Sequence, residues 1–295
     1  MPPPTARVLA QAKVNLLLRV GARDASGYHE IGTVFQRLEL ADEIVVRAVG
    51  TDRSLDVSGP RVPPDGLGPV AKNLAFRAAA AYAERATWLR GFAIELTKHI
   101  PAGGGLGGGS ADAGAVLRAL DALAPRPLGG TALWEIGRSL GADVPFLTTE
   151  HAIALGGGRG DKLAGAESLP SRDVVLLIPS FGIATADAYG WLDEGRGNTP
   201  VPPVAPATGK WGWDFVERHS INDFEPVVER RHPELRAYRQ RLGSLGARIA
   251  RLAGSGSTVF GVFAGSAPNE RELALDALMV ASRTSTRVVQ VEVLE

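Results

Sequence analysis

The amino-acid sequence predicts a two-domain protein of the α+β class, and two observations carry this prediction. The chain has 295 residues, which is long for one domain and comfortable for two. Strand-like and helix-like segments are mixed along it without the strict strand–helix alternation that a parallel α/β sheet produces. We place the break near 160–170 and expect an N-terminal domain over 1–165 and a C-terminal domain over 166–295.

The first part of the chain is expected to be rich in strands, after a loose N-terminal tail of prolines. The turn "RDASGYHE" has the aspartate, serine and glycine that are typical of a hairpin. The expected elements, in order, are strands at 8–20, 30–39 and 43–49, a helix at 71–86 and a strand at 92–96.

A helix is expected after the glycine-rich segment that follows, because apolar residues recur at helical spacing over 116–123. Ser110 is the expected N-cap of this helix, and Asp112 complements its positive end. The remaining expected elements are a helix at 131–140, a tight hairpin at 155–162, a buried strand at 173–178, an exposed proline-rich loop at 198–210, helices at 212–230 and 233–244, a glycine turn and strand at 253–263, a helix at 269–282 and a strand at 286–293.

Composition excludes several classes of function. Acidic and basic residues balance at 32 each, which argues against a general binder of nucleic acid or of anionic membranes. The chain has no cysteine, so disulfides, thiolate nucleophiles and cysteine-ligated zinc are excluded. The N-terminus lacks the pattern of a secretory signal, and no apolar run is long enough to span a bilayer. We therefore expect a cytoplasmic protein.

Lysine is rare in this chain, with five lysines against 27 arginines. Because arginine serves wherever a general cation suffices, each remaining lysine is a candidate for a role that needs a compact ammonium group. The five are Lys13, Lys72, Lys98, Lys162 and Lys210.

The segment "PAGGGLGGGSADA" at 101–113 has six glycines in seven positions. A flexible linker is disfavoured, because the flanking strand and helix both have buried patterns. The Walker A pattern fails because Ser110 stands where its lysine should be, and a Rossmann match is trivial in so glycine-rich a run. A strand, a glycine loop and a helix N-terminus together form an anion site, so a diphosphate or triphosphate is the expected ligand.

These residues carry a resemblance to a known family. The loop resembles the phosphate loop of the GHMP kinase superfamily, and "AQAKVNLLLRV" at 10–20 and "AGSGSTVFGVF" at 253–263 resemble its N- and C-terminal motifs. The segments "DASGYHE", "LGADVPF" at 140–146 and "SINDFEPVV" at 220–228 are similar to the branch that phosphorylates a diphosphocytidyl sugar alcohol in the non-mevalonate isoprenoid pathway. Gln11 departs from this pattern, and the region 186–215 matches it poorly.

The resemblance implies a fold and a nucleotide site. The fold would be the two-domain GHMP kinase fold, with a ribosomal-protein-S5-like nucleotide-binding domain followed by a ferredoxin-like α/β-plait domain. The cofactors would be ATP and Mg²⁺. The implied ATP-binding residues are Pro101, Ala102, Gly103, Gly104, Gly105, Leu106, Gly107, Gly108, Gly109, Ser110, Ala111, Asn73 and Lys98.

The resemblance also implies a catalytic pair, Lys13 and Asp143. By itself, an aspartate in such a loop is usually a turn residue that bonds local amides, and a strand lysine is usually exposed. Carried over from the family, Asp143 would be the general base or would orient the substrate hydroxyl, and Lys13 would keep it ionised. Strand alternation places Asn15 on the same face as Lys13, where it would hydrogen-bond substrate.

The acceptor is expected to be held by aromatic residues from both domains. The resemblance implies that Tyr28 and Tyr189 sandwich a cytosine ring, that His29 reads its polar edge and that Thr185 lies beside them. The alternative is that the tyrosines only cover the core. Ser110 is the candidate protein ligand for Mg²⁺, and the sequence has no zinc motif.

Three functions remain open at this point: a kinase of the diphosphocytidyl sugar alcohol, a GHMP kinase of another small alcohol such as homoserine or mevalonate, and a non-catalytic nucleotide-binding module. We expect small-molecule partners, no nucleic acid and no membrane, and a monomer or weak homodimer.

Overall fold

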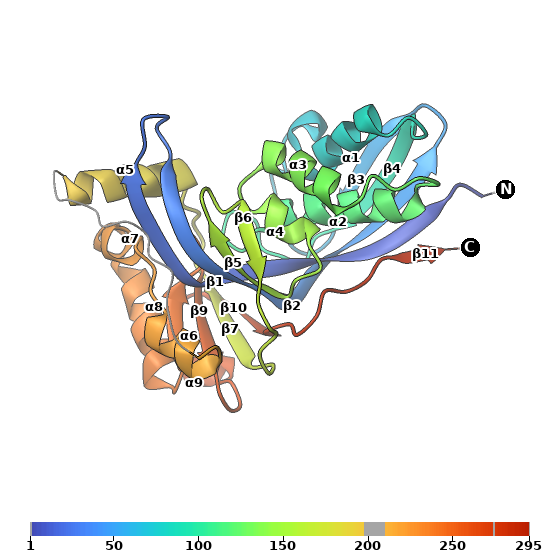
Figure 1. Ribbon diagram of the computed structural model, residues 1–295. Coiled ribbons are helices and arrows are strands. Elements are labelled where there is room, and N and C mark those ends of the chain that lie inside the picture. The colour runs from blue at the N-terminus through green and yellow to red at the C-terminus, as the bar shows by residue number, and fades with distance from the viewer. Residues whose placement is uncertain (1, 198–209, 274, 295) are drawn as a thin grey trace.

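The computed structural model describes residues 2–197, 210–273 and 275–294. Two lobes are joined by one long antiparallel hairpin, formed by strands β1 (Thr5–Arg23) and β2 (His29–Val49), which runs through both (Figure 1). The described ends of the chain lie close together at one end of the molecule, because the C-terminal strand β11 (Glu292–Leu294) pairs with the start of β1. The hairpin therefore determines how the two lobes face each other.

The first sheet has seven described strands, in the order β11-β1-β2-β4-β3, with β5 and β6 extending from β2. All of its pairs are antiparallel except β3 with β4. The helices of this lobe gather above the sheet, and α2 packs on β1 and β2. The bounds are β3 (Arg53–Ser58), β4 (Gly91–Thr97), β5 (Ile153–Gly157), β6 (Lys162–Gly165), the 3-10 helix η1 (Val70–Lys72), α1 (Leu74–Arg85), α2 (Gly108–Leu123), α3 (Gly130–Leu140) and α4 (Val144–Thr148).

The second sheet has four described strands in the antiparallel order β10-β7-β9-β8, and helices cover it on the left in Figure 1. Its elements are β7 (Asp173–Ile178), β8 (Ile249–Leu252), β9 (Val259–Phe263), β10 (Leu278–Arg283), α5 (Thr185–Arg196), α6 (Trp213–His219), α7 (Glu225–Arg231), α8 (Pro233–Ser244) and α9 (Glu270–Leu273). This order is that of a ferredoxin-like sheet, and the predicted α+β class is confirmed. In the described part of the chain, no helix is both long and apolar enough to cross a bilayer.

Four expected segments differ from the structure. The helix expected at 212–230 is two helices, α6 and α7, and the strand expected at 286–293 is confined to β11. The strands expected at 30–39 and 43–49 are one strand, β2, because a register shift opposite Gln11 to Lys13 accommodates the extra residues Leu38, Glu39 and Leu40 without ending the strand. The helix expected at 269–282 is wrong. Among the described residues of this range only α9 is helical, and Leu278–Arg283 forms β10, because pairing with the exposed edge of β7 outweighs local helix propensity. Most of the proline-rich loop expected at 198–210 lies outside the described residues.

The hairpin contributes to two separate hydrophobic cores. The first core contains Val8 to Leu16 of β1, the α2 face and part of the second sheet, and the second contains Leu18 and Val20 with residues of α5, α7 and α8. Because β1 is buried on both faces over 10–16, polar side chains on this stretch are buried as well. Gln11 is one of them, and its side chain donates to Ser285 Oγ (2.9 Å) and accepts from the Val289 amide (3.1 Å), which ties the C-terminal segment to the strand.

Candidate active site

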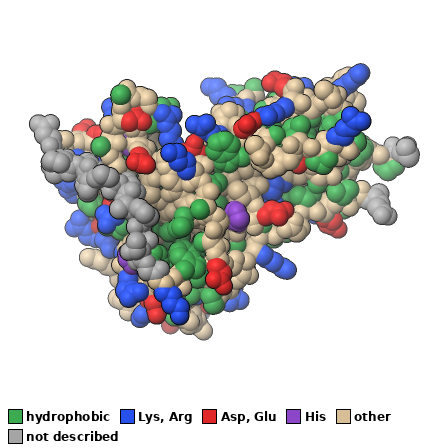
Figure 2. All heavy atoms as spheres, in the orientation of Figure 1, with side chains coloured by type: hydrophobic (Ala, Val, Ile, Leu, Met, Phe, Trp, Pro, Cys, Tyr) green, Lys and Arg blue, Asp and Glu red, His purple; other side chains and the backbone are tan. Residues whose placement is uncertain are grey.

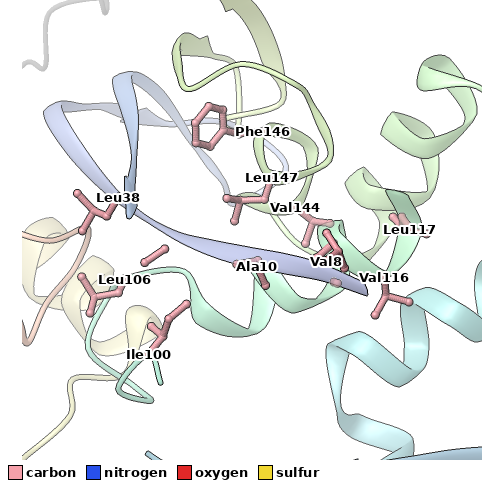
Figure 3. Packing of buried hydrophobic residues seen from close by; sticks show 14 of the residues in the cluster. Val8, Ala10, Leu38, Ile100, Leu106, Val116, Leu117, Val144, Phe146 and Leu147 are labelled. Atoms are coloured by element: carbon pink, nitrogen blue, oxygen red, sulfur yellow. The ribbon is translucent and has the colours of Figure 1, made fainter. Parts of the chain in front are cut away.

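The glycine-rich loop connects β4 to α2 and is anchored in the core at two points. The side chains of Ile100 and Leu106 are buried in the same hydrophobic cluster as Val8 and Ala10 of β1 (Figure 3). The Leu106 carbonyl accepts a hydrogen bond from the Lys13 amide (2.9 Å), which fixes the loop against β1. The glycines between these anchors are therefore held in place, unlike those of a linker.

Close packing explains why the loop needs glycine. Gly105 and Gly107 have φ values of +79° and +71°, a region that other residues rarely adopt. A Cβ atom at Gly105 would lie 2.1 Å from the Ala253 carbonyl oxygen, and one at Gly107 would lie 2.9 Å from Lys13 Cγ. The loop is thus pressed between β1 and the second glycine turn at 253–258.

Helix α2 begins at Gly108, with Gly107 as its N-cap, so the expected capping role of Ser110 is wrong. Gly107 in the left-handed conformation starts the helix without a side-chain cap, and the Ala111 amide donates to its carbonyl (2.8 Å). Because no side chain caps the first turn, its free amides point outward beside a bare loop, which is the arrangement that binds phosphate.

A cavity of about 260 Å³ lies along this loop. The structure places Asn73, Lys98 and all of 101–109 on its lining, and leaves Ser110 and Ala111 off it. It adds Lys72, which the sequence indicated only through the scarcity of lysine. Asn73 has a second task, since its side chain caps α1 by accepting from the Ala75 amide (2.9 Å).

Lys98 is buried between two carboxylates at the base of this cavity. Its ammonium group contacts Asp42 and lies 2.7 Å from Asp112 Oδ2. Burial raises the pKa of Asp112 to about 8, although Lys98 opposes the shift. The pKa of Lys98 is raised despite its burial, because both aspartates favour its charged form. No sequence pattern predicts these two contacts of Lys98. Asp42 lies 56 residues away in the sequence and meets Lys98 only in the folded chain.

Lys13 and Asp143 meet although 130 residues separate them. Lys13 Nζ lies 3.2 Å from Asp143 Oδ2 and donates to Asn15 Oδ1 (2.9 Å). Lys13 is only 3% exposed, whereas the Asp143 side chain at the start of α4 is 30% exposed. A buried lysine is therefore paired with a carboxylate that remains open to a ligand.

Asn15 is fully buried, and both ends of its amide are engaged. The amide oxygen accepts from Lys13, and the nitrogen donates to Thr33 Oγ1 (2.8 Å), which itself donates to the Leu17 carbonyl (2.7 Å). Asn15 does not line the cavity that Tyr28 and Tyr189 line. Its evident structural effect is to orient Lys13, and its expected contact with substrate stays a prediction.

A second, larger cavity of about 680 Å³ lies on the other side of the pair. The structure brings Tyr28, His29, Thr185 and Tyr189 together on its lining, from the hairpin turn and from α5. Ala142 and Pro145, which flank the Asp143 region, line its inner end. The Lys13–Asp143 pair therefore lies between this cavity and the glycine loop.

His29 and Tyr189 form the inner wall of the larger cavity. Their rings stack at 5.0 Å, and Tyr189 also packs edge-on against Phe224. The Gly21 carbonyl lies 3.0 Å from His29 Nδ1, and Asp193 Oδ1 lies 3.3 Å from Nε2. Burial, together with the Asp143 carboxylate, raises the pKa of Tyr189 to about 12.

Tyr28 forms the outer wall and is 55% exposed. The guanidinium of Arg159 stacks 3.7 Å above its ring centroid. Thr185 also lines the cavity, and its hydroxyl is 3.2 Å from Ser255 Oγ in the glycine turn. No sequence pattern indicates a role for Arg159, which lies in the turn of the expected hairpin at 155–162.

Mg²⁺ that accompanies a nucleotide needs few protein ligands, because it keeps several waters and takes phosphate oxygens. Ser110 is half-buried in the first turn of α2, and Asp112 has a buried Oδ1 without a hydrogen-bond partner. Across the described ranges, no three His, Cys, Asp or Glu side chains gather into a metal-binding cluster. These donors fit an ion held mainly by the nucleotide.

A glycine loop at a helix N-terminus, a lysine–aspartate pair and a second cavity opposite define a class of small-molecule kinases. The family model for the GHMP kinases N terminal domain matches residues 73–154, and the model for the GHMP kinases C terminal domain matches 214–280. The first match covers the glycine loop and Asp143, and the second covers the glycine turn at 253–258.

Curated relatives indicate one family within this class of kinases. The chain is 41% identical to the 4-diphosphocytidyl-2-C-methyl-D-erythritol kinase of Syntrophotalea carbinolica, over 86% of this chain and 88% of that protein. It is 40% identical to the enzyme of the same name from Moorella thermoacetica, over 86% and 89%. The chain therefore belongs to the 4-diphosphocytidyl-2-C-methyl-D-erythritol kinase family of the GHMP kinases.

Solved structures agree with this placement. The crystal structure of a 4-(cytidine 5'-diphospho)-2C-methyl-D-erythritol kinase matches with a TM-score of 0.77 and 34% identity, covering 95% of this chain and 99% of the other. A homoserine kinase from Cytophaga hutchinsonii matches with a TM-score of 0.66 at 16% identity, over 98% and 97%, which shows the shared fold alone. The two-domain GHMP kinase fold predicted from the sequence is confirmed.

Proposed function

We propose that this protein transfers the γ-phosphoryl group of ATP to the 2-hydroxyl of 4-diphosphocytidyl-2-C-methyl-D-erythritol, a step of the non-mevalonate isoprenoid pathway. The relatives' names supply the reaction. The observation that supports this reaction for the present chain is the Lys13–Asp143 pair, which lies between an anion-binding loop and an aromatic cavity. A module that only binds nucleotide would not need that pair.

The residues divide the chemistry between them. The amides of the glycine loop and of the first α2 turn hold the ATP phosphates, with Lys98 and Asn73 on the nucleotide side. Asp143 accepts the proton of the attacking hydroxyl or orients it. The new P–O bond forms as the bond between the γ-phosphorus and the bridging oxygen of ADP breaks, and Lys13 stabilises the charge that is transferred.

Mg²⁺ when bound neutralises charge on the β- and γ-phosphates, and Ser110 is the side chain we assign to it. Asn15 keeps the Lys13 ammonium aimed at Asp143 through its 2.9 Å hydrogen bond. In the larger cavity, Tyr28 and Tyr189 hold the cytosine ring and His29 reads its polar edge, with Thr185 beside them. We further propose a cytoplasmic enzyme that acts as a monomer or weak homodimer.

The test is an ATP-consumption assay across three alcohols, namely the diphosphocytidyl substrate, homoserine and mevalonate, with product mass as the second readout. We expect ADP and a singly phosphorylated product only with the diphosphocytidyl compound. Turnover of homoserine or mevalonate instead would assign the chain to another GHMP activity. ATP binding without turnover of any alcohol would support a binding module.

A further inference from the structure

Two of the arginines that line the larger cavity form no ion pair in the described part of the chain, although the charge of one of them, Arg159, helps to lower the pKa of the exposed Asp24. Three arginines and two aspartates line this cavity. Arg138 is paired with Asp161 (2.8 Å), and Asp193 is engaged by His29. Arg23 and Arg159 make no ion pair with any residue of the described ranges. The cavity wall therefore carries two guanidinium groups that have no ion-pair partner in the described part of the chain.

Both guanidinium groups are held on the same short turn, residues 24–28. Arg23, at the end of β1, donates from Nε to the Gly27 carbonyl (3.0 Å). Arg159 donates from Nη2 to Ser26 Oγ (2.8 Å) and stacks on Tyr28. These contacts use one or two of the five N–H donors of each group, so the others remain available to a ligand.

The turn that presents them is itself fixed. The Asp24 carboxylate accepts from the amides of Ser26 (2.8 Å) and Tyr28 (3.1 Å), and these bonds help to lower its pKa, the Ser26 hydroxyl contributing most. On the other side, Asp161 accepts from the Arg159 amide (3.0 Å) within a turn whose glycines, Gly158 and Gly160, have positive φ. Two arginines are thus positioned by rigid turns before any ligand arrives.

We propose that Arg23 and Arg159 bind the diphosphate group of the acceptor substrate. The inference rests on the proposed function and adds the groups that recognise the charged part of that substrate. A base on the free face of Tyr28 and a hydroxyl at Asp143 leave the diphosphate to span the cavity between them. A guanidinium matches two phosphate oxygens at once, which an ammonium group cannot do.

Figure 2 shows Lys and Arg side chains gathered on both sides of the hollow between the lobes. An anionic substrate is attracted to such a rim, and the attraction weakens as salt screens it. Cytidine, which has no phosphate, lacks this attraction. The change in the affinity ratio of cytidine diphosphate to cytidine when the two arginines are replaced therefore measures their contribution.

The experiment is calorimetric titration with cytidine and with cytidine diphosphate, the glycine loop being saturated with a non-hydrolysable ATP analogue. It compares the wild type with Arg23→Gln, Arg159→Gln and the double variant. The matched control is Arg7→Gln, an exposed position at the other end of β1. Each single variant should lower the affinity for cytidine diphosphate by roughly tenfold, as for a lost hydrogen bond to a charged group, with cytidine unchanged.

The salt series is the second readout. In the wild type the affinity for cytidine diphosphate should fall between low and high salt, and in the double variant it should fall much less. An unchanged affinity ratio in the double variant would overturn the proposal. Equal weakening of cytidine and cytidine diphosphate in Arg159→Gln would overturn it too, because Arg159 would then act on the base through Tyr28.

Turnover separates this proposal from the proposed function. If the wild type phosphorylates the diphosphocytidyl substrate and the double variant does so with an unchanged KM, only the assignment of the two arginines is wrong. If the wild type neither binds cytidine nor phosphorylates that substrate, the proposed function itself fails.

Discussion

Lys13 Nζ lies 3.2 Å from Asp143 Oδ2, with the lysine buried and the carboxylate partly open. We predict that Asp143→Asn and Lys13→Ala lower kcat by ~10²–10⁴-fold, the usual range for losing general acid–base help. The dissociation constant of ATP should change little, because the loop holds the phosphates. Steady-state rates and ATP titrations on the same preparations check both statements.

Lys13→Arg is the sharper variant of this pair. Arginine keeps the charge, but its planar fork does not fit the space between Asp143, Asn15 and Gly107. Activity should therefore still fall by at least tenfold on the same argument. Near-normal turnover in Asp143→Asn would make the aspartate structural.

Gly107 has a positive φ and stands directly over the Lys13 side chain. Gly107→Ala should reduce turnover strongly, because its methyl group would displace Lys13, and Gly107→Val should also block nucleotide binding. Gly129→Ala is the control: this N-cap glycine of α3 also has a positive φ, but its added Cβ meets open space. If both alanine variants keep equal activity at equal stability, the contact with Lys13 has no catalytic consequence.

Much of this site could be predicted from the sequence because its signals are local. The glycine loop, the strand alternation around Lys13 and the hairpin turn before Tyr28 each lie within one segment. The partners of these groups could not be predicted by pattern, because Asp42 reaches Lys98, and Arg159 reaches Tyr28, only through the fold. The error at β10 has the same origin, since its strand is stabilised by pairing with β7.

Tyr28 offers a test of base recognition without a stability cost. It is 55% exposed, so Tyr28→Ala should fold normally and raise the KM of the diphosphocytidyl substrate by roughly tenfold or more, as for one lost base–aromatic stack. Tyr189→Ala should have a similar effect on KM and should also lower the melting temperature, because Tyr189 packs on His29 and Phe224.

The KM for ATP should barely move in either tyrosine variant. His29→Ala should weaken the discrimination between cytidine and uridine substrates. A shift in the KM for ATP with none for the acceptor would place the tyrosines outside the acceptor site.

Asp112 predicts a specific dependence of stability on pH. Burial raises its pKa in the folded protein to about 8, from 3.8 when exposed. The folded state then binds more protons than the unfolded state between these values, so the Asp112 contribution to stability falls as pH rises from about 4 to 8. Asp112→Asn removes this titration. The free energy of unfolding of the variant, relative to that of the wild type, should therefore increase as pH rises from about 4 to 8.

Urea unfolding at pH 5, 6, 7 and 8 measures the difference, with Asp65→Asn as an exposed control. A difference between wild type and Asp112→Asn that stays constant with pH would show that the Asp112 carboxylate is already ionised in the folded state.

We predict that Arg37 positions Asp143 through the backbone of α4 and of the residues that follow it. Its buried guanidinium donates to three carbonyls at and beyond the end of α4, those of Phe146, Thr149 and His151, each at 3.0 Å. Burial and the charge of Arg118 lower its pKa to about 9, so it remains charged at neutral pH. Because α4 has only five residues, we expect these bonds to support the single helical turn, closed by the Leu147 amide on the Asp143 carbonyl (3.2 Å), that holds Asp143 at its N-terminus.

Arg37→Lys keeps the charge but cannot reach three carbonyls in one plane. Leaving buried carbonyls unpaired costs ~1–3 kcal/mol each, so the variant should lose at least ~2 kcal/mol of stability. Below its melting temperature, kcat should fall while the KM for ATP stays the same, because Asp143 moves and the glycine loop does not. Arg47→Lys on the same strand is the matched control, since its exposed pair with Glu95 contributes little. Loss of stability with an unchanged kcat would make Arg37 a purely structural residue, with no part in placing Asp143.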